Sequence, residues 1–267
     1  MKLDHESQVS SELSGSRLRT ETDFVALGQD LVFIGEVIGT IECEWQLRID
    51  HFLIGDLSAL IKFSERFDRI DRYDRYVLVN ALGDGRQLAA APVWQKTDAG
   101  YIVTCRVLKS FPRTSAHNIP TDLALSDAHD LFSVNGDFAT VTGLAALPQK
   151  IRSCLSTFRG EMQFNPIFGT RIKEYFDLFR DSPWLLRLIN LEVIRLACVP
   201  YYDSITKQDY TPLQSVLRVQ SIEQLSSGQN GNWLPFRFLL EIEGVGSWQH
   251  DIPIFAPTGE RPEAPGA

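Results

Sequence analysis

The sequence predicts an α+β protein, with an N-terminal all-β barrel or sandwich domain followed by a C-terminal domain of three helices packed on an antiparallel sheet. Two observations carry this prediction. Apolar and polar residues alternate in short runs between turns as far as about residue 113. Beyond residue 143, apolar residues recur at helical spacing, and three strand-like runs follow the last helix.

Periodicity and composition divide the 267 residues into five segments. Residues 1–23 are rich in Ser, Glu and Arg without periodicity, which predicts a disordered arm. Residues 24–115 form the predicted β domain, and residues 116–137, with several Asp and Ser residues, form a linker. Residues 138–256 form the predicted α+β domain, and the Pro- and Gly-rich residues 257–267 form a flexible tail.

Strict alternation of apolar and polar residues in the first domain predicts a half-buried strand at residues 41–49. Residues 76–81 and 87–94 form a predicted hairpin around the Gly83-Asp84-Gly85 turn. A second turn at residues 97–100 leads into a strand over residues 101–108. These short strands and tight turns are typical of a small barrel or sandwich.

The second domain begins with a short strand at residues 138–141 and a helix from Gly143, with Pro148 in its first turn, where a missing N–H is tolerated. A second helix follows over residues 170–179, with one apolar face. The apolar positions of these two helices are Leu144, Leu147, Ile151, Cys154, Leu155, Ile172, Tyr175, Phe176 and Phe179.

Ser182 and Pro183 then provide an N-cap and a first residue for a third helix, which Pro200 ends. The inward positions of this helix are Leu185, Leu188, Ile189, Val193 and Leu196. Three strands are predicted after it, at residues 215–222, 233–242 and 247–254.

A short, stiff segment over residues 159–170 joins the first two helices. Gly160 suits a helix C-cap, and Pro166 fixes φ and removes a hydrogen-bond donor. Gly169 allows a backbone turn that a Cβ would obstruct. The segment therefore sets how one helix follows the other, and it contains no predicted reaction centre.

Composition excludes several classes of function. The formal net charge of -8 disfavours bulk nucleic-acid binding, and the Arg residues of residues 65–75 are each matched by a neighbouring acid. We interpret that charged segment as a solvated loop or a protein-docking edge. No apolar run is long enough to span a bilayer, and the first residues lack the apolar region of a signal peptide, so we expect assembly in the cytosol.

Catalytic, cofactor and metal sites are not predicted. Cys43, Cys105, Cys154 and Cys198 are far apart and are interpreted as small buried residues with reduced thiols. The Asp127-Ala128-His129-Asp130 run would need further ligands from distant parts of the chain to hold a metal ion, and no sequence motif indicates such ligands. The chain also lacks the motifs G-x-S-x-G, H-E-x-x-H and a phosphate-binding glycine loop.

Four residues of the interhelical segment form a spaced motif. Gly160-Glu161 follows the first helix, and Pro166-x-x-Gly169 precedes the second. With Gly143 and the order of helices and strands, this motif resembles the baseplate wedge family of contractile phage tails, over roughly residues 128–256. That family also supplies a baseplate subunit to type VI secretion and related contractile injection machines, and was long labelled lysozyme-like.

The resemblance implies a structural protein of the virion tail baseplate, assembled in the host cytoplasm in multiple copies with six-fold symmetry. Its implied partners are other baseplate wedge and hub proteins, with the tail tube and first sheath ring as further candidates. Neither nucleic acid nor a membrane span is implied. An open sheet edge could seat the sheath by strand addition, and we expect that edge at residues 248–254.

One departure concerns partner binding. The family commonly carries a Glu-Pro-Arg triplet at the end of its third helix, which docks into the central bundle of the wedge. Here the matching residues are Val199, Pro200 and Tyr201, followed by Tyr202. If docking is kept, it rests on apolar and aromatic burial, for which Tyr is a common anchor. The alternative is that Val199 and Pro200 only end a helix.

Two alternatives to a wedge subunit stay open. One is a peptidoglycan-cleaving, lysozyme-like tail enzyme, with Glu161 as the acid and Glu174 or Asp177 as the second carboxylate. Glu161 could instead accept backbone N–H bonds or pair with Arg159 or Arg171. The other alternative is a cytosolic adaptor that reuses the fold.

Overall fold

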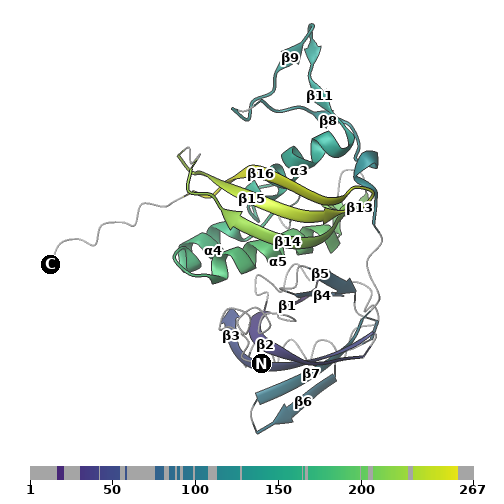
Figure 1. Cartoon of the computed structure of the whole chain (residues 1–267), viewed down its shortest axis with the longest axis vertical. Coiled ribbons are helices and arrows are strands. Elements are labelled where there is room, and N and C mark those ends of the chain that lie inside the picture. Colours follow the sequence, from purple (N-terminus) through teal and green to yellow (C-terminus); the bar gives the residue numbers. More distant parts are fainter. Residues whose placement is uncertain are drawn as a thin grey trace, which may run out of the picture. The chain divides into compact units, whose positions relative to one another are not determined.

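The computed structural model describes most of the chain beyond residue 113 and the strands before it. The described residues are 17–20, 31–41, 43–54, 58, 76–80, 84–87, 89–90, 93–98, 100–107, 113–126, 128–163, 165, 168–198, 200–203, 207–227 and 231–257. Helices and antiparallel sheets occur in separate parts of the chain, which confirms the α+β class (Figure 1).

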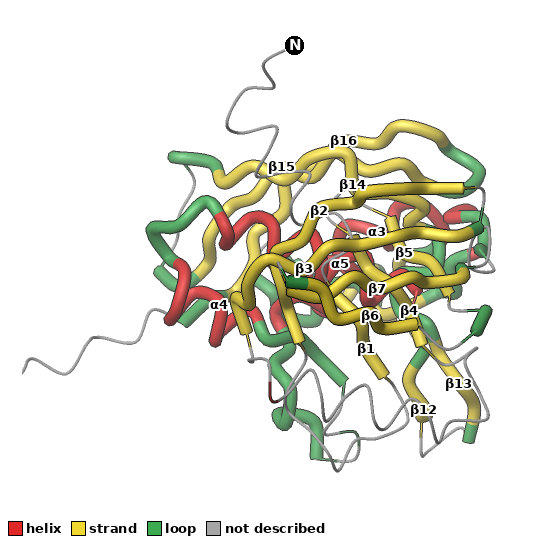
Figure 2. The backbone as a smooth tube through the Cα atoms, turned by 90° about the horizontal axis from the view of Figure 1, so that it is seen from below, coloured by secondary structure: helices red, strands yellow, loops and turns green. Residues whose placement is uncertain are grey.

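The chain divides into two compact units: Met1–Arg113 with Ile194–Val219, and Thr114–Val193 with Gln220–Ala267. The first unit contains a seven-stranded antiparallel sheet of order β5-β4-β1-β2-β3-β7-β6. Figure 2 shows β2, β3, β7 and β6 as neighbours in this sheet. The bounds are β1 Arg17–Thr20, β2 Leu31–Ile41, β3 Glu44–Ile54, β4 Tyr76–Asn80, β5 Asp84–Gln87, β6 Val93–Thr97 and β7 Gly100–Arg106.

The expected single strand over residues 41–49 is wrong. Ile41 pairs with Glu44 and Cys43 lies in a turn, so this stretch contains the end of β2 and the first half of β3. Alternation continues through the turn because neither Glu42 nor Cys43 is a strong turn former. Cys43 consequently lies exposed at the turn and not in the core, whereas Cys105, Cys154 and Cys198 are buried as expected.

The two later hairpins are predicted with different success. Thr97 pairs with Gly100, which confirms the turn between β6 and β7. Asn80 pairs with Asp84, so the predicted turn residues Asp84 and Gly85 belong to β5. Gly83, the first residue of the predicted turn, lies outside the described residues.

Strand β1 lies inside the segment predicted to be a disordered arm. Its residues pair with both β2 and β4, as shown by Arg17 opposite Val32 and Val79. A strand of four residues is too short to show periodicity, so its sequence does not predict it. Pairing on both sides supplies its backbone hydrogen bonds. The other residues of the predicted arm lie outside the described residues.

The second unit is built on a three-stranded antiparallel sheet of order β14-β15-β16. Strand β14 (Val216–Gln224) and helix α5 (Trp184–Cys198) each continue across the boundary between the two units. Strands β15 (Trp233–Ile242) and β16 (Gly246–Phe255) pair along their whole length, from Trp233 opposite Phe255 to Ile242 opposite Gly246. All three strands were predicted to within two residues.

Short elements precede the sheet in the second unit, and β12 and β13 form a separate pair in the first. The helices α3 and α4 contribute the side chains that pack against the sheet: Ser156 Oγ accepts a hydrogen bond from Phe255 N, and the rings of Phe176 and Phe236 meet edge to face. The bounds are η3 Ala116–Asn118, β8 Asp122–Leu123, β9 Ser133–Val134, β10 Asp137–Phe138, β11 Thr140–Val141, η4 Gly143–Ala146, α3 Leu147–Ser156, α4 Ile172–Phe179, β12 Tyr201–Asp203 and β13 Gln208–Tyr210.

The predicted helical faces are buried almost throughout. Leu147, Ile151, Cys154 and Leu155 of α3 are buried, whereas Leu144 is half-buried in the 3₁₀ turn that precedes the helix. Ile172, Tyr175 and Phe176 of α4 are buried, and all five predicted inward positions of α5 are buried. Ser182 Oγ accepts a hydrogen bond from Trp184 N at 3.3 Å, consistent with the predicted start of α5.

A buried polar pair joins α4 to α5. The Tyr175 hydroxyl donates to Glu192 Oε1 at 3.0 Å, and both residues are fully buried. A buried carboxylate needs such donors because removing it from water is costly. The pair therefore fixes the rotation of α4 relative to the first part of α5 within the second unit.

We predict that Cys43 reacts with a thiol reagent much faster than the other three cysteines. Burial raises the pKa of the Cys105 thiol to about 12, so its reactive thiolate is scarce at pH 8. Cys154 and Cys198 are also buried, whereas Cys43 is exposed. Time-resolved alkylation followed by peptide mass spectrometry measures the four rates. Equal labelling of Cys43 and Cys105 in the folded protein would contradict the placement of these strands.

Candidate functional site

The interhelical segment, residues 157–171, begins where α3 ends. Thr157 is the C-cap in an extended conformation, with its N–H and its hydroxyl both donating to Ser153 O at 3.1 and 2.8 Å. The expectation that Gly160 caps this helix is therefore wrong. The chain leaves the helix at Thr157 because the following residue, Phe158, pairs with Thr170.

The two ends of the segment cross side by side. Phe158 and Thr170 form an isolated parallel bridge, in which Thr170 N donates to Thr157 O at 2.8 Å and Arg159 N donates to Thr170 O at 3.1 Å. The Thr170 hydroxyl, which is buried, also donates to Leu155 O at 3.0 Å. These bonds supply a partner for a carbonyl in the last turn of α3, which the helix itself leaves without one.

Gly169 makes this close crossing possible. It has φ of +101°, and a Cβ there would lie 2.6 Å from Thr157 O and 2.8 Å from Phe158 C. The prediction that a side chain would obstruct the turn is confirmed. Gly160 also has a positive φ of +89°, but nothing lies within 4 Å of the place its Cβ would occupy. Gly160 therefore serves the turn conformation, and Gly169 serves both conformation and space.

Glu161 binds backbone, as one of its predicted roles required. Its Oε2 accepts a hydrogen bond from Phe158 N at 2.7 Å, and its own N–H donates to Phe158 O at 3.2 Å. The carboxylate thus closes the Gly160-Glu161 turn with a charge-assisted bond. The predicted ion pair to Arg171 does not form: the guanidinium of that residue binds Glu174 through Nε at 2.9 Å and Nη2 at 2.6 Å.

The predicted partner-binding residues follow α5 directly. Val199 lies outside the described residues, as does Pro166 of the spaced motif. Pro200 is half-buried, and β12 begins with Tyr201 and Tyr202, which pair with Tyr210 and Asp209 of β13. The Tyr201 and Tyr210 rings meet edge to face with centroids 5.4 Å apart. Tyr210 is partly exposed, so this aromatic pair presents apolar surface at a hairpin.

The end of α5 is held within the first unit. Arg113 Nη1 donates to Ala197 O at 2.7 Å, which places a cation at the helix C-terminus, where the macrodipole favours it. Leu213 N donates to Leu196 O at 3.0 Å. The backbone just before Pro200 and Tyr201 is therefore held in place by these hydrogen bonds.

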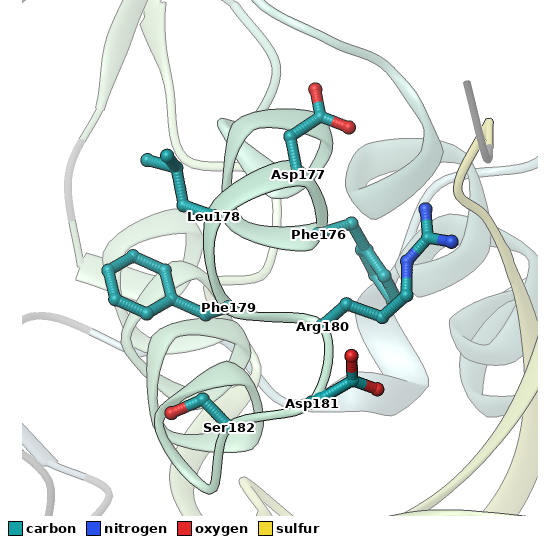
Figure 3. A pocket seen from close by; sticks show the side chains of 7 residues that line it. All are labelled: Phe176, Asp177, Leu178, Phe179, Arg180, Asp181 and Ser182. Atoms are coloured by element: carbon teal, nitrogen blue, oxygen red, sulfur yellow. The ribbon is translucent and has the colours of Figure 1, made fainter. Parts of the chain in front are cut away.

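A hollow of about 600 Å³ lies at the turn between α4 and α5 (Figure 3). Its lining residues are Phe176, Asp177, Leu178, Phe179, Arg180, Asp181 and Ser182. Asp177, a candidate second carboxylate of the enzyme alternative, lines this hollow, whereas Glu161 does not. The two carboxylates are thus not brought together around this hollow.

In the described part of the chain, no group of three His, Cys, Asp or Glu side chains is placed to hold a metal ion. His129, of the Asp127-Ala128-His129-Asp130 run, stacks on the Trp233 ring with centroids 3.8 Å apart. No helix among the described residues has the length and apolar character needed to cross a bilayer.

Comparison with protein-family models, curated proteins and solved structures found no match.

The strand pairs before α3 differ from what the sequence predicts. Residues 121–137 belong to the predicted linker and residues 138–141 to a predicted single strand, yet the structure has two short strand pairs, β9 with β10 and β8 with β11, and several exposed large apolar side chains. The signal was present, because Leu131, Phe132 and Val134 are more apolar than a linker requires.

We predict that Gly169→Ala destabilises the protein far more than Gly160→Ala. A positive φ costs a non-glycine residue about 1–3 kcal/mol at either position, and the contact with backbone atoms of residues 157 and 158 adds to that cost only at Gly169. Urea denaturation of both variants measures the difference in the free energy of unfolding. Equal losses for the two variants would show that the close crossing is not present.

Proposed function

We propose that this chain is a structural wedge subunit of the baseplate of a contractile phage tail or a related contractile injection machine. The observation that carries the proposal is the crossing at residues 157–171, in which the residues of the family-like motif have defined physical roles. Glu161 closes the turn on Phe158 N, and Gly169 permits the bridge to Thr170. Glu161 and Gly169 thus each have a backbone role in the junction that the motif spans, and Gly160 supplies the positive φ of its turn.

The proposed role is joining other wedge proteins and seating the tail sheath, in multiple copies within a six-fold assembly. Strand β16 supports the second part, because it has β15 as its single neighbour in the three-stranded sheet. An edge strand can receive a partner strand through its backbone groups. Its residues 248–254 are the proposed attachment edge, and the Arg237–Asp251 ion pair, at 2.8 Å, braces this strand against β15.

The seven-stranded sheet of the first unit is proposed to belong to a barrel or sandwich that acts as a second attachment module. Its edge strands β5 and β6 provide two places where a hub protein, the tail tube or a neighbouring wedge could pair. The support is the size of this sheet within the first unit and its position before the wedge-like part of the chain.

We propose that the protein acts without catalysis. Glu161, the obvious acid for a glycosidase, is exposed and uses Oε2 to accept the Phe158 N–H at 2.7 Å. Glu174, one candidate for the second carboxylate, is bound by Arg171. Glycoside cleavage needs two carboxylates facing each other across a sugar-binding cleft, which these interactions do not favour.

The proposed docking residues are Val199, Pro200, Tyr201 and Tyr202, with the Tyr201–Tyr210 ring pair as the described part of the contact. Apolar and aromatic burial would replace the charged clamp of the family. Because Arg113 and Leu213 fix the end of α5, the docking residues would lose little conformational entropy on binding.

A pull-down of the full chain from producing cells tests this proposal. We expect wild type to recover other baseplate or sheath proteins, and Pro200→Asp with Tyr201→Asp to lose them, because two buried charges oppose an apolar contact. Leu178→Asp is the matched control, since it adds an acidic charge at a residue that is 68% exposed on α4 and leaves Pro200, Tyr201 and Tyr210 unchanged, so it should still recover the partners. Unfolding temperatures of all variants show whether the hairpin still folds.

The wild-type protein and a Glu161 variant distinguish the wedge subunit from the enzyme and the adaptor. Recovery of no tail component by wild type would contradict the wedge proposal. Peptidoglycan cleavage that Glu161→Gln abolishes would favour the lysozyme-like enzyme. If wild type recovered no tail proteins and cleaved no peptidoglycan, the cytosolic adaptor would be favoured.

A further inference from the structure

Residues 121–141, named here the acidic arm, project from the second unit as two consecutive strand pairs (Figure 1). The first pair is β8 with β11, in which Leu123 lies opposite Thr140. The second pair is β9 with β10, in which Val134 lies opposite Asp137. The tip turn is Asn135-Gly136, with φ of 55° and 90°, the left-handed conformation that a two-residue hairpin requires.

The acidic arm is anchored at its base. The Gln149 side chain of α3 accepts a hydrogen bond from Leu125 N and donates to Leu123 O, both at 2.8 Å. His129 stacks on Trp233 at the start of β15. Ala124 N donates to Ala139 O and Ala139 N donates to Phe132 O, which ties the two strand pairs together. The arm is thus a folded projection with a fixed base.

Apolar exposure is concentrated on this arm. Of the nine large apolar residues that are exposed in the described part of the chain, five lie within its 21 residues, with Phe138 at 62% exposure. The five are Leu123, Leu131, Phe132, Val134 and Phe138. An ordered segment that gathers such residues in water is the usual mark of a binding surface.

The register places apolar side chains on both faces of the tip. Val134 pairs with Asp137, whereas Phe138 pairs with Ser133. Paired residues share a face and adjacent residues alternate, so Val134 and Phe138 lie on opposite faces. A flat partner would cover one of them and leave the other exposed. A groove would cover both.

Charge identifies the kind of groove. The chain has no Lys or Arg between Arg113 and Lys150, and this stretch contains Asp122, Asp127, Asp130 and Asp137. Lys150 interacts electrostatically with Asp122 at the base, whereas Asp130 and Asp137 are exposed farther along the arm. A uniformly acidic arm is repelled by nucleic acid, by anionic lipid and by the arm of a second copy, and is attracted by cationic side chains.

We propose that the acidic arm inserts into a groove on another protein, and that this groove is apolar inside and bordered by Lys or Arg. The inference is independent of the proposed baseplate role, because it uses none of the residues on which that role rests. Arm insertion would bury Phe138 and Val134 together. Asp137 shares a face with Val134, so a cation of the border would lie beside that face, and Asp130 would meet the border farther from the tip.

Site-specific photocrosslinking of the full chain in its producing cell tests the inference. Benzoylphenylalanine is placed at Phe138, and the matched control is the same probe at Leu178, which is 68% exposed on α4 of the same unit. We expect a crosslink to another protein at position 138 with about tenfold higher yield than at position 178, because the arm would be a principal anchor of the contact. The crosslinked peptide should map to an apolar groove with Lys or Arg at its border.

Charge exchange then tests the cationic border. Asp130→Lys with Asp137→Lys should lower the yield at position 138 about threefold or more, and a Lys→Glu change at the mapped border should restore it. Both aspartates are exposed, so the unfolding temperature should stay unchanged. Crosslinking to a second copy, to phospholipid or to no protein would overturn the proposal, as would a mapped groove without cations or a yield indifferent to the aspartates. Each of these outcomes is independent of whether the pull-down recovers tail proteins.

Discussion

The parallel crossing of residues 157–159 and 169–170 is the constraint on which the second unit depends. It ends α3 at Ser156 and fixes where α4 begins, because Thr170 is held by backbone bonds from both sides. Once these two helices are fixed, Ser156 can bind β16 and Phe176 can pack against Phe236 of β15. A single glycine, Gly169, permits that crossing, since a Cβ would meet backbone atoms that cannot move aside.

Side chains that bind backbone carry much of the organisation around this crossing. Glu161 accepts the Phe158 N–H, and Gln149 holds two backbone groups at the base of the acidic arm. Such bonds give backbone groups a side-chain partner, across three residues for Glu161 and across 24 and 26 residues for Gln149. Helix α3 thereby connects both proposed functions of the second unit: its end defines the wedge-like junction, and its first turns hold the projecting arm.

The sequence predicted the elements with strong periodicity and missed those defined by pairing. The buried faces of α3, α4 and α5 and the strands β14, β15 and β16 follow from apolar spacing alone. The turn at Cys43, strand β1 and the short pairs of the acidic arm depend on partners elsewhere in the chain, which no local pattern reveals. For the candidate site, the need for glycine at position 169 and the backbone role of Glu161 were predictable. The bridge between Phe158 and Thr170, which accounts for the end of α3 at Ser156, was not predictable, because no local pattern shows which residues pair.

The central claim is that the chain is a structural part of a contractile baseplate. The measurement that tests this most directly is cryo-electron microscopy of intact tails or injection particles from the producing cell. Our account predicts density for this chain in the baseplate, repeated around the six-fold axis, with the motif residues Gly160, Glu161 and Gly169 inside the subunit and Pro200 to Tyr202 at a subunit contact. Complete particles that assemble and contract without any copy of the chain would contradict it.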